Sequence, residues 1–194
     1  MKKLFLVSSF ADSYNQFPDF VGENISGKSV AFIDTASHTE ERKSYVDKAE
    51  EAWIDLGLTV NRVDIFDTNV ATDIKAADYI YVAGGNTFYL MQELQKSGVD
   101  ELIKEHINQG KIYIGESAGS IIMCPNIEYI KEMDDITMGP ELNSYEGFNF
   151  ISEYPLPHVG NKYLNEAVET IIETYQATLQ LHPFTDEEVF LIKE

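Results

Sequence analysis

The sequence predicts an α/β protein in which a mostly parallel central sheet carries helices on both faces, a sandwich that is flavodoxin-like in outline. Five apolar runs of strand length recur along the chain, and segments with helical periodicity lie between them. This alternation is typical of parallel sheets built from right-handed crossover units. The chain has 194 residues, 44% of them hydrophobic, and it shows no repeat or linker. We therefore expect residues 1–194 to form one domain.

The predicted strands are apolar runs that each end in turn residues. They cover 3–9, 29–36, 58–67, 78–85 and 111–117, and a last strand, EVFLI, lies near the end of the sequence. In a parallel sheet the loops at the carboxyl ends of the strands gather at one edge, so we expect the functional residues there.

The predicted helices have an apolar stripe and recognisable ends. Ser37 and Glu40 form a capping-box pattern that predicts a helix over 38–56, and Gly57 ends that helix. The other predicted helices run from GGN to Gly98, over 99–109 and over 161–176. Two less regular segments, NIEYIKEMDD and EGFNFISEY, are interpreted as short strands or loops.

Charge and composition exclude several classes of function. The chain has 33 acidic and 14 basic residues and a formal charge of −19, so its surface repels phosphate backbones and we expect no nucleic-acid partner. No segment approaches the roughly 20 apolar residues of a membrane helix, and the apolar run in MKKLFLVSSF is too short for a signal peptide. The single cysteine, Cys124, excludes an internal disulfide and suits a reducing compartment. These features predict a cytoplasmic protein without a membrane partner.

The fifth predicted strand ends in GESAG, which fits the G-x-S-x-G pattern of a nucleophile elbow. In such an elbow a strained serine presents its hydroxyl at a strand-to-helix turn, and small residues two positions before and after it prevent clashes. Ser117 is therefore the candidate nucleophile. The N–H of Ala118 is a candidate oxyanion donor at the start of the next helix. The alternative is that GESAG is simply a tight structural turn.

The fourth predicted strand ends in AGGNTFYL, where adjacent glycines allow backbone N–H groups to face a ligand. Gly85 is the candidate second oxyanion donor, and Asn86 is a candidate contact to the substrate. Asn86 or Thr87 can also cap the following helix. A loop that binds nucleotide phosphates is a weaker alternative, since neither G-x-x-x-x-G-K-[ST] nor G-x-G-x-x-G is present. A purely structural turn is a further alternative.

A serine nucleophile needs a base, and the chain has four histidines. His158 follows a stiff, extended segment in YPLPHVGN, so it is favoured over His182, which we expect in a loop near the end. We expect His106 to be a partly exposed helix residue. His38 is expected at a helix N-terminus, where a substrate contact is also conceivable.

Three motifs, GGNTFYL, GESAGSII and PLPH, resemble in order and spacing the peptidase E (aspartyl dipeptidase) family of serine peptidases, to which cyanophycinase is related. The resemblance covers nearly the whole chain. It implies a fold similar to class I glutamine amidotransferases, with Ser117 as nucleophile and His158 as base. It also implies an oxyanion hole formed by Gly85 and Ala118.

The resemblance further implies an acid as the third member of a catalytic triad. Asp186, in HPFTDEEVFLI just before the final predicted strand, is preferred because a residue that enters a strand is well fixed. Its task would be to hold the tautomer of His158 and to stabilise the imidazolium. The alternatives lie between the serine and the histidine and are Glu132, Asp134 and Asp135.

The chain departs from the family at one point that bears on specificity. Aspartate-specific members are expected to carry an arginine on the helix after the histidine, whereas here the only cation in that segment is Lys162. A lysine cannot reproduce the planar fork of arginine, so strict Asp-X specificity is not predicted.

The resulting prediction is a serine peptidase that acts on small peptides, with no cofactor and no metal, and with no prediction of oligomeric state. The alternatives are an esterase of the α/β-hydrolase type and a non-catalytic small-molecule binding domain. A glutaminase is disfavoured, because its nucleophile is a cysteine at the elbow and Cys124 lies seven residues later.

Overall fold

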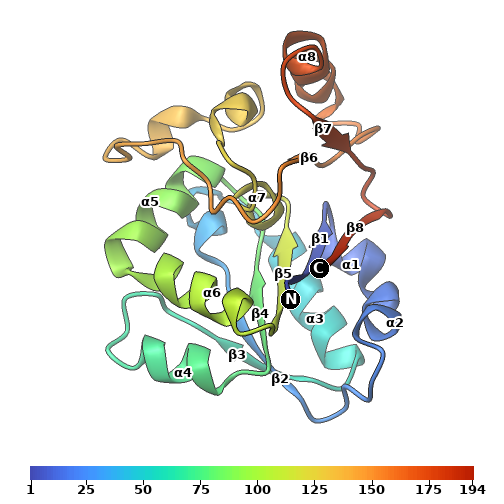
Figure 1. The fold of residues 1–194 in the computed structure, drawn as a ribbon, viewed down its shortest axis with the longest axis vertical. Helices are drawn as coiled ribbons and strands as arrows, with labels where there is room; N and C mark the ends of the chain where they lie inside the picture. The colour runs from blue at the N-terminus through green and yellow to red at the C-terminus, as the bar shows by residue number, and fades with distance from the viewer.

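The computed structural model describes residues 1–194 and is built around a six-stranded sheet in the order β3-β2-β4-β5-β1-β8 (Figure 1). All neighbouring strands pair in parallel except β8, which runs antiparallel to β1 at one edge. The strands are β1 (Lys3–Val7), β2 (Ser29–Ile33), β3 (Thr59–Arg62), β4 (Tyr79–Val82), β5 (Ile112–Glu116) and β8 (Val189–Lys193). The predicted mostly parallel sheet is confirmed. The predicted strand over 58–67 is shorter, because β3 lies at the exposed edge and has only β2 to pair with.

Helices cover both faces of this sheet (Figure 1). The first face is packed by α1 (Phe10–Ser13), α2 (Phe17–Val21) and α3 (Ser44–Asp55), whose buried side chains belong to one hydrophobic cluster. The second face is packed by α4 (Val70–Ala76), α5 (Thr87–Ser97), α6 (Val99–Asn108) and the single turn α7 (Ala118–Ile121). The last helix, α8 (Asn165–Tyr175), lies apart from the sheet and packs against the 3₁₀ helix Glu128–Glu132 (Figure 1). Because β1 and β2 lead into one layer while β4 and β5 lead into the other, their loops diverge at the carboxyl edge and leave a crevice there.

Aromatic side chains fill the layer beneath α1 and α3. The rings of Phe10 and Trp53 stack with centroids 4.2 Å apart, and Phe17 meets Trp53 edge-on at 5.0 Å. Tyr81 of β4 packs against Phe10 at 5.4 Å and is fully buried. Such aromatic pairs stabilise a core beyond their area burial by about 0.5–1.5 kcal/mol each. This packing holds α1 rigidly beside the carboxyl ends of β4 and β5.

The predicted helix over 38–56 is wrong in its first turns. Residues Thr35–Thr39 form a 3₁₀ helix instead, and α3 begins only at Ser44. The Ser37 hydroxyl donates to the carbonyl of Asp34 at 2.8 Å, so it caps no α-helix. Glu40 accepts a hydrogen bond from Tyr45 and does not complete a capping box. Both side chains of the predicted capping box thus have other partners, which only the folded chain supplies.

Several short elements were not predicted from the sequence. These are α1, α2, α4 and two 3₁₀ helices. The first, Glu128–Glu132, lies in a segment expected to be a short strand or loop, and the second, Ile136–Met138, follows that segment directly. A second, two-stranded parallel sheet joins β6 (Tyr154–Leu156) to β7 (Leu181–Pro183). No helix has the length and apolar character that a membrane crossing requires.

Candidate active site

The turn between β5 and α7 holds Ser117 in a strained backbone conformation, with φ 47° and ψ −107°. Two close backbone approaches make this turn possible. A Cβ on Gly115 would lie 2.4 Å from the carbonyl oxygen of Gly119, and a Cβ on Gly119 would lie 2.3 Å from that of Val82. Both positions therefore exclude any side chain, which is the packing that a nucleophile elbow requires. The GESAG pattern encodes this geometry directly.

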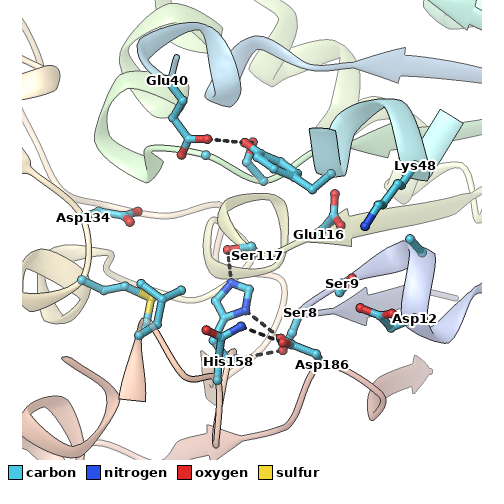
Figure 2. Close-up of a pocket in the computed structure, with 17 residues that line it drawn as sticks. Ser8, Ser9, Asp12, Glu40, Lys48, Glu116, Ser117, Asp134, His158 and Asp186 are labelled. Atoms are coloured by element: carbon cyan, nitrogen blue, oxygen red, sulfur yellow. Dashed lines mark hydrogen bonds and ion pairs between the residues drawn. The ribbon is translucent and has the colours of Figure 1, made fainter. Parts of the chain in front are cut away.

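The structure brings Ser117, His158 and Asp186 into one hydrogen-bonded line (Figure 2). His158 Nε2 lies 2.9 Å from Ser117 Oγ, and His158 Nδ1 lies 2.8 Å from Asp186 Oδ1. Because an ionised carboxylate only accepts, Nδ1 carries the proton and Nε2 is free to accept from the hydroxyl. The hydrogen bond from His158 is the main cause that lowers the pKa of Asp186, and Asn161 adds to it, so Asp186 stays ionised.

The loop that carries His158 is fixed by contacts with β1 and with Asn161. His158 has a left-handed backbone, with φ 68°, and its N–H donates to Ser8 Oγ at 3.0 Å. Ser8 in turn donates to the carbonyl of Phe184 at 3.3 Å, which ties the loop before Asp186 to the same strand end. Asn161 Nδ2 donates to the second carboxylate oxygen of Asp186 at 2.8 Å. Ser8 and Asn161 were not singled out from the sequence. A polar residue at the end of the first strand was the available signal for Ser8.

These side chains open into a cavity of about 430 Å³ (Figure 2). The cavity is formed by β1 and α1, by α3 with the loop before it, by Gly84 and Gly85 after β4, and by the loops around His158 and Asp186. Apart from His158, one cation, Lys48, lines it. The carboxylates that line it are Asp12, Glu40, Glu116, Asp134 and Asp186.

Glu116 is a buried carboxyl group directly before Ser117, with 2% of the residue exposed. Its Oε1 accepts from the N–H of Phe10 at 2.9 Å, and its Oε2 accepts from the hydroxyl of Tyr81. Burial raises the pKa of Glu116 above its usual value. Its partners belong to β4, which neighbours β5 in the sheet, and to α1, the helix that follows β1 on the other side of β5. Glu116 therefore fastens the elbow to both neighbours. A charged residue at the end of an apolar strand was the signal that sequence reasoning did not use.

Gly84 and Gly85 bring the backbone after β4 to the edge of the cavity. The N–H of Gly85 makes no hydrogen bond to the chain, and the N–H of Ala118, as the first residue of α7, has no partner within its helix. Both are therefore available to a ligand.

Asn86 does not line the cavity. Its Oδ1 accepts from the N–H of Tyr89 and its Nδ2 donates to the carbonyl of Asp135, both at 2.9 Å. Asn86 therefore takes the helix-cap role that the sequence allowed for it, and its expected contact to the substrate stays a prediction.

We expect Gly85→Ala to destabilise the protein by about 3 kcal/mol, the sum of backbone strain and overpacking. Gly85 has φ 132°, and a Cβ there would lie 2.2 Å from the backbone of Ala36. Urea unfolding of the variant measures the loss. The matched control is Gly98→Ala, at φ 75° with nothing within 4 Å of its Cβ, which should lose only about 1 kcal/mol. Equal losses in both variants would contradict the close approach at Gly85.

The alternative acids do not contact His158. Glu132 and Asp135 do not line the cavity, and Asp135 accepts from the N–H of Thr137 at 2.9 Å. Asp134 lines the cavity and accepts from the N–H of Thr87, at the start of α5, at 2.8 Å. Desolvation raises the pKa of Asp134 to about 6.

The other three histidines lie outside the cavity and are held by the surrounding chain. His38 lies in the 3₁₀ helix after β2, and its Nε2 is 3.1 Å from Asp34 Oδ1. His106 was expected to be partly exposed, but only 4% of it is exposed and it bonds the carbonyl of Ile112 at 2.9 Å. His182 was expected in a loop, but it lies in β7 and its ring stacks on Phe190 with centroids 3.7 Å apart. No group of three or more His, Cys, Asp or Glu side chains is arranged to hold a metal ion.

Comparisons with known proteins identify the family of the chain. Residues 4–194 match the model of peptidase family S51. An uncharacterized peptidase from Pasteurella multocida is 46% identical over 195 residues, covering 99% of this chain and 94% of that protein. Peptidase E from a Nostoc species is 30% identical over 169 residues, covering 87% of this chain and 67% of that protein. A crystal structure from Listeria monocytogenes, of a protein assigned to peptidase E, is similar with a TM-score of 0.93 at 42% identity and covers 99% of this chain and 94% of that one.

Proposed function

The chain belongs to peptidase family S51 and is a serine peptidase, and from this premise we propose that it hydrolyses short peptides by covalent catalysis on Ser117. The observation that carries the proposal is the hydrogen-bonded line from Asp186 through His158 to Ser117 Oγ, with distances of 2.8 and 2.9 Å. A nucleophile, a base and a group that orients the base are the parts that acyl transfer needs.

In the proposed reaction Ser117 Oγ attacks the carbonyl carbon of the peptide bond while His158 Nε2 takes the hydroxyl proton. The tetrahedral intermediate carries its negative charge on the former carbonyl oxygen. The N–H groups of Gly85 and Ala118 donate to that oxygen. Donors of this kind each stabilise the transition state by about 3–4 kcal/mol.

The intermediate then collapses with cleavage of the C–N bond. The leaving amine takes the proton from His158 and departs, and Ser117 remains acylated. Water attacks the ester with His158 again as base, which releases the acid and restores the hydroxyl. Asp186 accepts from Nδ1 throughout and stabilises the imidazolium, and Asn161 keeps the carboxylate in that orientation.

Short peptides are the proposed substrates because the cavity, at about 430 Å³, is of the size that encloses a small ligand. We do not assign Asp-X specificity to the site. The cavity lining contains no arginine, and Lys162 does not line it but lies over the ring of Tyr163, with Nζ 5.7 Å from the centroid.

A dipeptide library tests the proposal. We expect turnover of free dipeptides and labelling of Ser117 by a fluorophosphonate. Hydrolysis of esters alone would favour the esterase alternative. An enzyme that neither turns over any library member nor reacts with the probe would favour a non-catalytic binding domain. More than tenfold preference for an N-terminal Asp over Ala would show that Asp-X specificity survives without the arginine.

A further inference from the structure

Lys48, a residue of α3 that the proposed chemistry does not use, has its ammonium group free at the edge of the active-site cavity. It lines the cavity, yet it forms no ion pair within 4.0 Å and donates no hydrogen bond to the chain. Lys28, Lys96 and Lys104, by contrast, each have carboxylate partners. Lys48 is the lysine that lines the cavity, so its ammonium group is available to a ligand there.

Figure 2 shows Lys48 reaching from α3 into the side of the cavity where Ser9 and Asp12 lie, with Asp134 on the other side of Ser117. Every other charged group that lines the cavity, apart from His158, is a carboxylate. A substrate carboxylate is repelled at those positions and attracted only at Lys48, because like charges at close range oppose binding. Lys48 is thus the side chain of the cavity that favours a substrate carboxylate.

The strand order indicates which end of a substrate meets Lys48. β4 and β1 flank β5, so Gly85 and Ser8 lie on opposite sides of Ser117. The leaving amine must lie against His158, which gives it a proton, and the backbone of His158 is bonded to Ser8. The chain continues from Ser8 into α1, and α1 packs against α3. The half of the substrate that leaves with the amine is therefore directed toward Lys48.

We propose that Lys48 binds the free C-terminal carboxylate of a short peptide and so selects substrates whose leaving half ends close to the scissile bond. The inference rests on the proposed peptidase function of the same site. Lys48 lies on α3 and is a different cation from Lys162, which stands where the family's arginine is expected for the side chain of an N-terminal Asp.

The test compares a well-hydrolysed dipeptide from the library with its C-terminal amide, for the wild type and for Lys48→Met. Met keeps the length of the side chain and removes the charge. We expect the wild type to prefer the free acid by about tenfold in kcat/KM, the size of one charge-assisted hydrogen bond. In Lys48→Met the preference should fall to within about twofold, while hydrolysis of the amide stays unchanged.

Lys162→Met is the matched control, since it makes the same substitution at a lysine that lies outside the cavity. It should keep the full preference for the acid. The inference is overturned if the wild type does not prefer the free acid, or if Lys48→Met keeps that preference. It is also overturned if Lys48→Met loses activity equally toward the acid and the amide.

A third substrate separates the two sources of a carboxylate. If Lys48→Met loses activity toward an amidated dipeptide with N-terminal Asp, but not toward the amide with N-terminal Ala, the ligand is the Asp side chain and the assignment to the C-terminus is wrong. If the wild type hydrolyses neither acids nor amides, the peptidase proposal itself fails, and the inference fails with it.

Discussion

Ser117→Ala is expected to lower kcat/KM for dipeptides by about 10³-fold or more, because Ser117 Oγ is the hydroxyl that bonds His158 Nε2 and can form the acyl intermediate. His158→Ala should cause a similar loss, and the double variant should be scarcely worse than either single one, since nucleophile and base act as a unit. The measurement is steady-state hydrolysis of the best library dipeptide.

The fold should tolerate Ser117→Ala, since its Oγ bonds only His158. Equal melting temperatures for variant and wild type are the control for folding. The φ of 47° remains strained for Ala as for Ser, so the substitution adds no new backbone cost. Dipeptide turnover in Ser117→Ala at the wild-type rate would refute covalent catalysis at this serine.

Asp186→Asn should lower kcat by about 10³-fold or more, with a smaller change in KM. An Asn amide in this place can donate to Nδ1, which favours the wrong tautomer and leaves Nε2 protonated and unable to accept from Ser117. Asn161 Nδ2 would also lose the charge that it now contacts at 2.8 Å. The measurement is kcat and KM for the same dipeptide.

The matched control is Asp135→Asn, the same substitution at an exposed alternative acid that bonds only the N–H and hydroxyl of its neighbour Thr137. We expect its kcat to stay within about threefold of the wild type, the range of a surface change that removes no contact to the site. If Asp135→Asn lost much of its kcat and Asp186→Asn lost little, the third member of the triad would be Asp135 and not Asp186.

The principal strands and long helices were predictable because their sequence patterns are local. β5 and its GESAG end follow from an apolar run and from two glycines at positions where a Cβ would lie within 2.4 Å of a backbone carbonyl. By contrast, α1 has four residues and α7 is a single turn, too short for any helical periodicity to show. The failed helix start at Ser37 shows the same limit, since its competing partner, the carbonyl of Asp34, is available only once the loop has folded.

The candidate site also has features that the sequence predicts and features that depend on the fold. The sequence indicated a nucleophile, a base and an acid at Ser117, His158 and Asp186, but it left other acids open because proximity cannot be read from a linear chain. Asn86 shows the same limit, because an amide in a glycine loop serves equally well as a ligand contact or as a helix cap, and the sequence named both roles. In the folded protein Asn86 caps α5, and its Nδ2 also donates to the carbonyl of Asp135 at 2.9 Å, so both polar atoms of the side chain have partners.

By itself the sequence determined the α/β class, the elbow and the glycine loop, since each depends on residues adjacent along the chain and on sterics within one turn. Only the tertiary structure decided which carboxylate reaches His158, that Glu116 joins α1 to β4, and that the free cation of the cavity is Lys48 on α3. The physical reason is that hydrogen bonds and charge interactions act over a few ångströms. Residues such as Lys48 and Asp186 share a cavity only after the sheet has brought their segments to one edge.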